Sequence, residues 1–159
     1  MVSVLFVCLG NICRSPMAEG LFLHHVKAAG LESQIRVDSC GTGDWHVGGR
    51  PDPRMVSTAE RHGIDLPSRA RQLQTTDFAD FDYIIAMDEQ NQRDILSLAR
   101  QAGGGRAEVL KMRTFDDTAP DADVPDPYYG GQQGFEAVYQ MLDRSTRALL
   151  AHIRTTHGY

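Results

Sequence analysis

Short, nearly continuous apolar runs alternate along the chain with segments in which apolar residues recur at helical spacing. The runs 2–7 and 83–87 are typical of strands buried on both faces of a parallel sheet. Segments 34–38 and 107–112 are predicted as two further strands. Helices are predicted over 15–29, 53–62, 89–102 and 135–153. Because strands and helices alternate, the sequence predicts an α/β sandwich on a mainly parallel sheet.

The ends of the first predicted helix carry recognisable signals. Ser15 is a residue type that caps helix starts, Pro16 fits the first turn, and Gly30 is a typical stop. Two long segments have no periodicity and are predicted as loops, 39–52 and 113–132. Loops of this length are uncommon in compact domains and are often functional.

Size and charge limit the classes of function. The 159 residues fit one domain spanning 1–159, with ordinary shares of hydrophobic (42%) and charged (23%) residues. The net charge of −5 does not favour nucleic acid or an anionic membrane as a partner. Any anion that binds is therefore expected to be held by a local site.

Cysteine usage and the amino terminus bear on the compartment. There are three cysteines, and the chain starts directly into an apolar strand without the basic region and cleavage site of a leader. No apolar stretch approaches the roughly 20 residues that a membrane-spanning helix needs. We therefore expect a cytoplasmic protein without a disulfide framework.

The strongest chemical signal follows the first strand, in the stretch from Cys8 to Ser15. A tight loop between a strand and a helix can turn its backbone N–H groups inward and bind an anion. Gly10 and Asn11 tolerate the left-handed conformation that such a loop needs. Arg14 offers a fork of donors that matches two phosphate oxygens.

The same environment favours the thiolate form of Cys8. The thiolate would lie under a bound phosphorus atom, which indicates covalent phosphoryl transfer rather than binding alone. The Ser15 hydroxyl is expected to donate to that sulfur. The alternative is a structural Cys8 packed under the sheet, with Arg14 as a surface charge.

A phosphate ester also needs an acid to protonate the leaving oxygen. The best candidate is Asp126, which lies between two prolines in the loop 113–132. Tyr128 and Tyr129 follow it and are expected to line a slot for an aromatic substrate. The other aspartates of this loop are rival candidates: Asp116, Asp117, Asp121 and Asp123.

The stretch 7–19, VCLGNICRSPMAE, resembles the phosphate-binding loop of the low-molecular-weight protein tyrosine phosphatases. Further matching stretches are VDS at 37–39, WHVG at 45–48, RHGI at 61–64, ARQ at 70–72, FDYI at 81–84, AMD at 86–88 and DPYYG at 126–130. The resemblance runs from about residue 2 to residue 155. It implies a flavodoxin-like three-layer sandwich, with four parallel strands and helices on both faces.

The resemblance also implies roles for single residues. Cys8 would be the nucleophile, Arg14 the phosphate clamp, and Asp126 first the acid and then the base. The residues implied in phosphate binding and loop support are Leu9, Gly10, Asn11, Ile12, Cys13 and Ser15. The implied walls of the cleft are Leu9, Ile12, Trp45, Tyr128 and Tyr129. Cys13 is similar to the family's second cysteine, which can trap an oxidised nucleophile as a disulfide.

The same resemblance implies no metal and no organic cofactor. The expected partner is a tyrosine-phosphorylated protein, with a tyrosine kinase as a second possible partner, and the expected state is a monomer. One departure from the family is Ser68, which stands where many relatives carry a histidine that supports the loop's hydrogen bonds.

The sequence also bears on three alternative functions. Arsenate reduction needs further cysteines, and none lies beyond Cys40. Phosphoarginine phosphatases resemble this loop but carry threonine where Ile12 stands, so Ile12 favours tyrosine. A non-catalytic phosphoprotein-binding module would need neither Cys8 nor Asp126.

Overall fold

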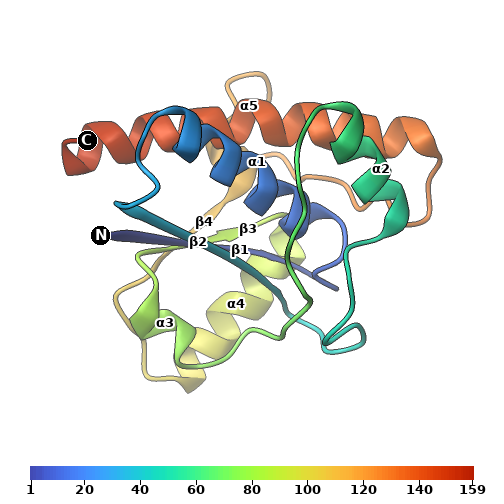
Figure 1. Cartoon of the computed structure of the whole chain (residues 1–159). Helices are drawn as coiled ribbons and strands as arrows, with labels where there is room; N and C mark the ends of the chain where they lie inside the picture. Colours follow the sequence, from blue (N-terminus) through green and yellow to red (C-terminus); the bar gives the residue numbers. More distant parts are fainter.

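The computed structural model describes residues 1–159, and its elements alternate as the sequence predicts. The four strands β1 (Val2–Cys8), β2 (Ile35–Gly41), β3 (Tyr83–Ala86) and β4 (Glu108–Lys111) form one parallel sheet in the order β2-β1-β3-β4. One face carries α1 (Arg14–Ala28), α2 (Pro53–Arg61) and α5 (Gln132–His157), and the other carries α3 (Asp77–Asp80) and α4 (Glu89–Gln101) (Figure 1). The predicted three-layer α/β sandwich is confirmed.

The central strand β1 explains why its sequence is an unbroken apolar run. Successive side chains of a strand point to opposite faces. Val4 and Phe6 join the larger core cluster with α1 and α5, whereas Leu5 and Val7 join the smaller cluster beneath α4. Both faces of β1 are therefore covered, as expected for a strand inside a parallel sheet.

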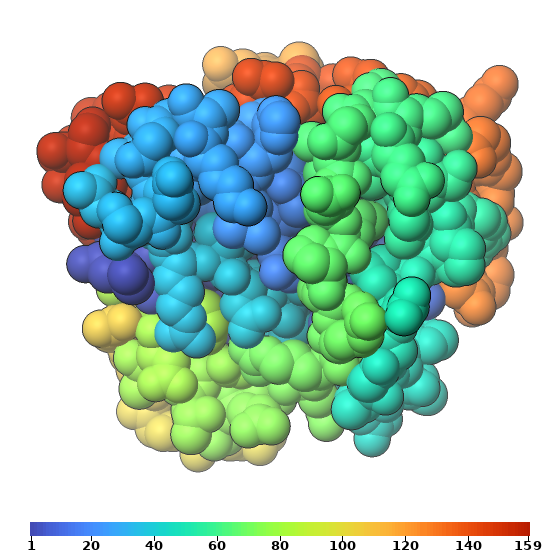
Figure 2. Space-filling view, viewed as in Figure 1, coloured from blue at the N-terminus to red at the C-terminus, as the bar shows by residue number.

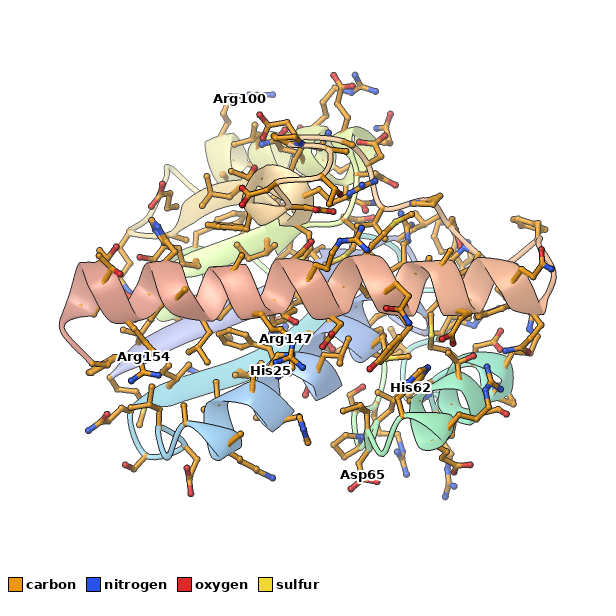
Figure 3. The ribbon with its side chains drawn as sticks, turned by 90° about the horizontal axis from the view of Figure 1, so that it is seen from above. His25, His62, Asp65, Arg100, Arg147 and Arg154 are labelled. Atoms are coloured by element: carbon orange, nitrogen blue, oxygen red, sulfur yellow. The ribbon has the colours of Figure 1, made fainter.

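Helix α5 is the longest element and crosses the whole molecule beside α1 and α2 (Figure 3). The predicted apolar face of this helix is fully buried: Phe135, Val138, Leu142, Leu149 and Ile153. The helix extends beyond both predicted ends, to Gln132 and His157. None of the helices is both long enough and apolar enough to cross a lipid bilayer.

Several local predictions were wrong. Strand β2 continues to Gly41, into the predicted loop, because Ser39, Cys40 and Gly41 pair with Phe6, Val7 and Cys8 of β1. The short helix α3 and the 3₁₀ turn η1 (Met112–Phe115) were not predicted. Both are single turns of chain, too short to produce an apolar period.

The predicted helix cap at Ser15 was also wrong. Helix α1 begins one residue earlier, at Arg14, and Cys13 occupies the cap position without a side-chain cap hydrogen bond. The Ser15 hydroxyl is instead 3.0 Å from the Cys8 sulfur. Ser15 therefore lies inside the first turn of α1, with its hydroxyl beside Cys8.

The carboxyl ends of the parallel strands meet at one edge of the sheet, where ligands bind in folds of this class. There β1 ends beside β2, with Cys8 opposite Gly41. The extended segment 62–72 crosses between α1 and the loop after β2 (Figure 2). It is tied to this edge by the bond from Gly41 N–H to the Arg71 carbonyl, 2.8 Å long.

Candidate active site

The loop from Leu9 to Cys13 turns its carbonyl groups outward. The carbonyl oxygens of Cys8 and Leu9 accept from the N–H groups of Thr42 and Gly43, both at 2.9 Å. The Ile12 carbonyl accepts from Asp52 N–H at 2.8 Å. None of the five backbone N–H groups of residues 9–13 donates to an acceptor of the chain. Five free donors beside a helix start form the anion cradle that the sequence predicts.

Asn11 holds this loop in its conformation. Its φ of 57° is left-handed, which asparagine tolerates better than most residues. Its side-chain Nδ2 donates to Ser15 Oγ at 2.8 Å and to Ser39 Oγ at 3.0 Å. Its Oδ1 accepts from Arg71 N–H at 3.1 Å. The buried side chain of Asn11 therefore joins the loop, β2 and the segment after α2.

The hydrogen-bond network limits the Ser15 hydroxyl hydrogen to two acceptors. Because Asn11 uses both of its N–H hydrogens as donors, Ser15 Oγ accepts one of them, and its own hydrogen is left for the Cys8 sulfur or for the Cys40 carbonyl oxygen at 3.4 Å. The Cys8 sulfur lies 3.0 Å away. The sulfur is the nearer acceptor, and a thiolate carries no hydrogen, so with Cys8 ionised the Ser15 hydroxyl donates to it and stabilises its charge.

Glu19, on α1, ends the same network. Ser39 Oγ lies 2.5 Å from Glu19 Oε1, and both side chains are buried. Burial raises the pKa of Glu19 to about 7, while the Ser39 hydrogen bond acts in the opposite direction. Ser68, the expected departure from the family, makes no side-chain hydrogen bond. The network therefore ends on the Arg71 backbone N–H, which donates to Asn11, and on the Glu19 carboxyl, which accepts from Ser39.

The side chain of Arg14 is buried to 97% and is held by two hydrogen-bond acceptors and one further ion pair. Its Nη1 donates to Asp88 Oδ2 at 2.7 Å and to the Val124 carbonyl at 3.0 Å, and its Nη2 lies 3.7 Å from Asp126 Oδ2. Burial acts to lower the pKa of Arg14, but the sulfur of Cys8 and the Asp88 carboxylate outweigh it and raise the pKa. The guanidinium is a fixed positive charge facing the loop.

Asp126 reaches the same place from the loop before α5. Its Oδ1 accepts from Tyr128 N–H at 3.0 Å, which leaves Oδ2 directed toward Arg14. Of the five aspartates of the loop 113–132, Asp126 is the one that lines the cleft. Asp116, for comparison, is buried with Arg113 and Arg144, and Asp123 pairs with Lys111 at 2.7 Å.

These groups open into one cleft of about 340 Å³. Cys8 and Arg14 lie among the residues that line it, and Trp45, Tyr128 and Tyr129 supply aromatic walls. Ile12, Leu9 and Gly10 also contribute, and His46 is a lining residue that the sequence did not single out. The structure thus brings together the predicted nucleophile, clamp, acid and aromatic slot.

Cys13 also lines the cleft, and its thiol has no hydrogen-bond partner. Burial, followed by the nearby Asp52 and Cys8, raises the pKa of Cys13 above its ordinary value. Cys13 is therefore a neutral thiol next to the candidate nucleophile. No cluster of three or more His, Cys, Asp or Glu residues is arranged to hold a metal ion.

Sequence reasoning missed two groups that shape the site. Asp88 caps α4 through Asn91 N–H at 2.7 Å while it holds Arg14. Asp52 caps α2 and binds Arg54, whose guanidinium carbon lies 5.2 Å from the centre of the Tyr128 ring. An aspartate directly before a predicted helix was the available signal in both cases.

Comparison with known proteins places this geometry in a family. The family model described as low molecular weight phosphotyrosine protein phosphatase matches residues 3–157. The low molecular weight phosphotyrosine protein phosphatase of Schizosaccharomyces pombe is 49% identical over 93% of this chain and 95% of its own. The crystal structure of YfkJ from Bacillus subtilis superposes with a TM-score of 0.89 at 42% identity, covering 98% and 96% of the two chains. The Drosophila arginine phosphatase DARP superposes with a TM-score of 0.90 at 34% identity, covering 95% and 97%.

Proposed function

This chain belongs to the low molecular weight phosphotyrosine protein phosphatases, and we propose that it hydrolyses phosphotyrosine through a phosphocysteine intermediate on Cys8. The observation that carries the proposal is the position of the Cys8 sulfur. It lies 3.0 Å from an oriented Ser15 hydroxyl, at the base of a cleft that Arg14 and Asp126 share. Five free N–H groups in the loop above it support binding of a phosphate dianion.

In the first step the thiolate of Cys8 attacks phosphorus and forms an S–P bond. The P–O bond to the tyrosine breaks, and Asp126 gives its proton to the departing phenolate oxygen. Arg14 and the loop N–H groups stabilise the charge on the three equatorial oxygens. Because Asp88 and Val124 already hold the Arg14 guanidinium, little reorganisation is needed when this charge develops.

In the second step Asp126, now ionised, takes a proton from water as the water oxygen attacks phosphorus. The S–P bond breaks, inorganic phosphate leaves, and the thiolate of Cys8 is restored. Ser15 assists here because its hydrogen bond stabilises the departing thiolate. Asp126 ends the cycle protonated, ready for the next substrate.

The aromatic walls support the choice of substrate. A phosphotyrosine ring is long enough to place its phosphate on a deep loop and wide enough to contact Trp45 and Tyr128. Phosphoserine lacks that reach. Phosphoarginine is a second candidate, because the Drosophila arginine phosphatase has the same fold at a TM-score of 0.90. Ile12 on the cleft wall offers only apolar contact to a guanidinium, which favours the phenyl ring.

Several wider features form part of the same proposal. The whole chain, 1–159, acts as one phosphatase domain, as a monomer in the cytoplasm, without a metal or organic cofactor. Its partners are tyrosine-phosphorylated proteins, and a tyrosine kinase is among them. The family supports the phosphoprotein substrate.

The test is phosphate release from a phosphotyrosine peptide in EDTA, with wild type compared with Cys8→Ser. Serine keeps the size of the side chain but is a far weaker nucleophile here, so turnover should disappear. Unchanged turnover in Cys8→Ser would contradict the assignment. A parallel phosphoarginine peptide decides between the two substrates, since faster turnover of phosphoarginine would overturn the choice of tyrosine.

A further inference from the structure

A second hollow adjoins the active-site cleft across a shared wall. Leu9 and Trp45 line both spaces, and the second measures about 520 Å³. We call it the α4 groove, and its walls include Leu9, Trp45, Gln72, Asp94, Leu98 and Gln101. Leu9 and Trp45 are 41% and 70% exposed, so the wall that the two hollows share includes apolar side chains at the surface.

One face of α4 forms the far side of this groove. Asp94, Leu98 and Gln101 are spaced four and three residues apart, which places them on the same face of the helix. Ile95, the next residue after Asp94, is fully buried and anchors the helix against the sheet. The groove therefore has a rigid wall whose polar side chains face outward.

The charge of the groove is one-sided. Asp94 is the only ionisable residue among the ten that line it. Its carboxylate accepts from Gln90 Nε2 at 3.0 Å and has no ion-pair partner, since the adjacent Arg93 pairs with Glu89. Gln72 Nε2 donates a hydrogen bond to the Thr42 carbonyl, and Gln72 Oε1 remains a free acceptor. The groove offers acceptors and a negative charge.

We propose that the α4 groove binds a residue of the substrate next to the phosphotyrosine and selects lysine or arginine there. The inference rests on the phosphatase function, because a phosphotyrosine in the cleft leaves its peptide backbone at the mouth of the cleft. Leu9 and Trp45 form the side of this mouth that borders the α4 groove, here called the Leu9–Trp45 rim, and a peptide that crosses it places a neighbouring residue in the groove. A basic side chain can lay its apolar stem along Leu9, Trp45 and Leu98 and direct its charged end to Asp94.

The same geometry disfavours an acidic neighbour. A glutamate in the groove would face Asp94 with no cation of the protein to compensate it. The site is exposed, so the selection is moderate and depends on salt. The selection affects kcat/KM only for peptide substrates, because an aryl phosphate without a peptide chain does not extend past the Leu9–Trp45 rim.

The experiment compares phosphotyrosine peptides that carry arginine, glutamine or glutamate at single positions from three residues before to three after the tyrosine. We measure kcat/KM at low salt for wild type, Asp94→Asn and Asp94→Lys. Glu32→Gln is the matched control, because Glu32 is exposed before β2, at the opposite end of the sheet. For wild type and Glu32→Gln we expect kcat/KM to be about tenfold higher with arginine than with glutamate at one peptide position. Attraction of the arginine and repulsion of the glutamate by an exposed Asp94 together allow a difference of this size.

In Asp94→Asn the ratio of kcat/KM for the arginine peptide to that for the glutamate peptide should fall below about threefold. In Asp94→Lys the glutamate peptide should have the higher kcat/KM. A reversed preference cannot arise from misfolding. Identical ratios in wild type and both Asp94 variants, or no preference in wild type, would overturn the proposal. Failure of wild type to hydrolyse an aryl phosphate would instead contradict the proposed phosphatase mechanism, so the two failures are distinguishable.

Discussion

The carboxylate of Asp88 lies 2.7 Å from Nη1 of Arg14, although 74 residues separate them in the sequence. The other oxygen of Asp88 caps α4 through Asn91 N–H. One side chain thus caps the start of α4 and fixes the guanidinium that faces the phosphate loop. This relationship ties the strength of the phosphate clamp to the stability of a neighbouring helix.

Replacing Asp88 should separate these two roles. Asp88→Asn keeps a good cap residue but removes the charge, so kcat should fall more than stability. Asp88→Ala loses both, and we expect it to cost about 2–4 kcal/mol of unfolding free energy as well. Urea unfolding and steady-state kinetics measure the two effects. Equal kcat in wild type and Asp88→Asn would show that Arg14 needs no charged partner.

Arg54 should position the acid. Its guanidinium carbon lies 5.2 Å from the centre of the Tyr128 ring, and Tyr128 N–H binds Asp126 Oδ1. Arg54→Ala removes this contact, so Asp126 should protonate the leaving oxygen less well. We expect kcat to fall about twofold to fivefold for phenyl phosphate and less for p-nitrophenyl phosphate, whose leaving group needs no acid.

Arg61→Ala is the matched control for Arg54, because Arg61 is an exposed arginine on the same helix and pairs with Glu136. It should leave the dependence on the leaving group unchanged. The same loss for both leaving groups in Arg54→Ala would mean that the contact supports the fold rather than the acid.

Glu19 should make stability depend on pH. Its pKa is about 7 in the folded protein against 4.5 for an ordinary glutamate, mainly because the side chain is buried. The folded state therefore holds this proton more tightly than the unfolded state. The contribution is complete below pH 4.5 and is lost as pH rises through 7.

Glu19→Gln lacks this titration. Its unfolding free energy relative to wild type should rise by up to about 3 kcal/mol between pH 4.5 and pH 8. Urea unfolding across this range measures the difference, with Glu32→Gln as an exposed control. A pH-independent difference between Glu19→Gln and wild type would show that Glu19 is ionised throughout.

Cys13 should make oxidation of the enzyme reversible. Both Cys8 and Cys13 line the cleft, and the raised pKa of Cys13 keeps it a thiol while peroxide reacts with Cys8. The sulfenic acid on Cys8 then condenses with the Cys13 thiol, with release of water, to give a disulfide that dithiothreitol reduces. Wild type should regain most of its activity, whereas Cys13→Ala should progress to sulfinic acid and stay inactive. Mass spectrometry that finds sulfinic Cys8 in wild type would contradict this.

The sequence identified the centre of the site because that centre is local. Cys8, Asn11, Arg14 and Ser15 lie within eight residues, between an apolar strand and a helix, so their proximity follows from chain connectivity. The main helices and strands were also predictable, because each buries one face or both faces and shows that period. Element ends were less predictable: Ser15 was expected both to cap the helix and to donate to Cys8, and only the structure shows that the helix begins one residue earlier, at Arg14.

Contacts between distant segments were decided only by the tertiary structure. Asp88 preceded a predicted helix and Ser39 lay in a stretch that matched the family, but neither signal showed which distant side chain each would contact, and Arg54 had no signal of its own. Ser39 and Asp88 reach the site because parallel strands bring their carboxyl ends to one edge of the sheet, with β1 between β2 and β3, and Arg54 reaches it from α2. The α4 groove arises in the same way, from Leu9, Gln72 and Asp94. Local side-chain chemistry determined what the loop can bind, whereas strand order determined which distant charges surround it.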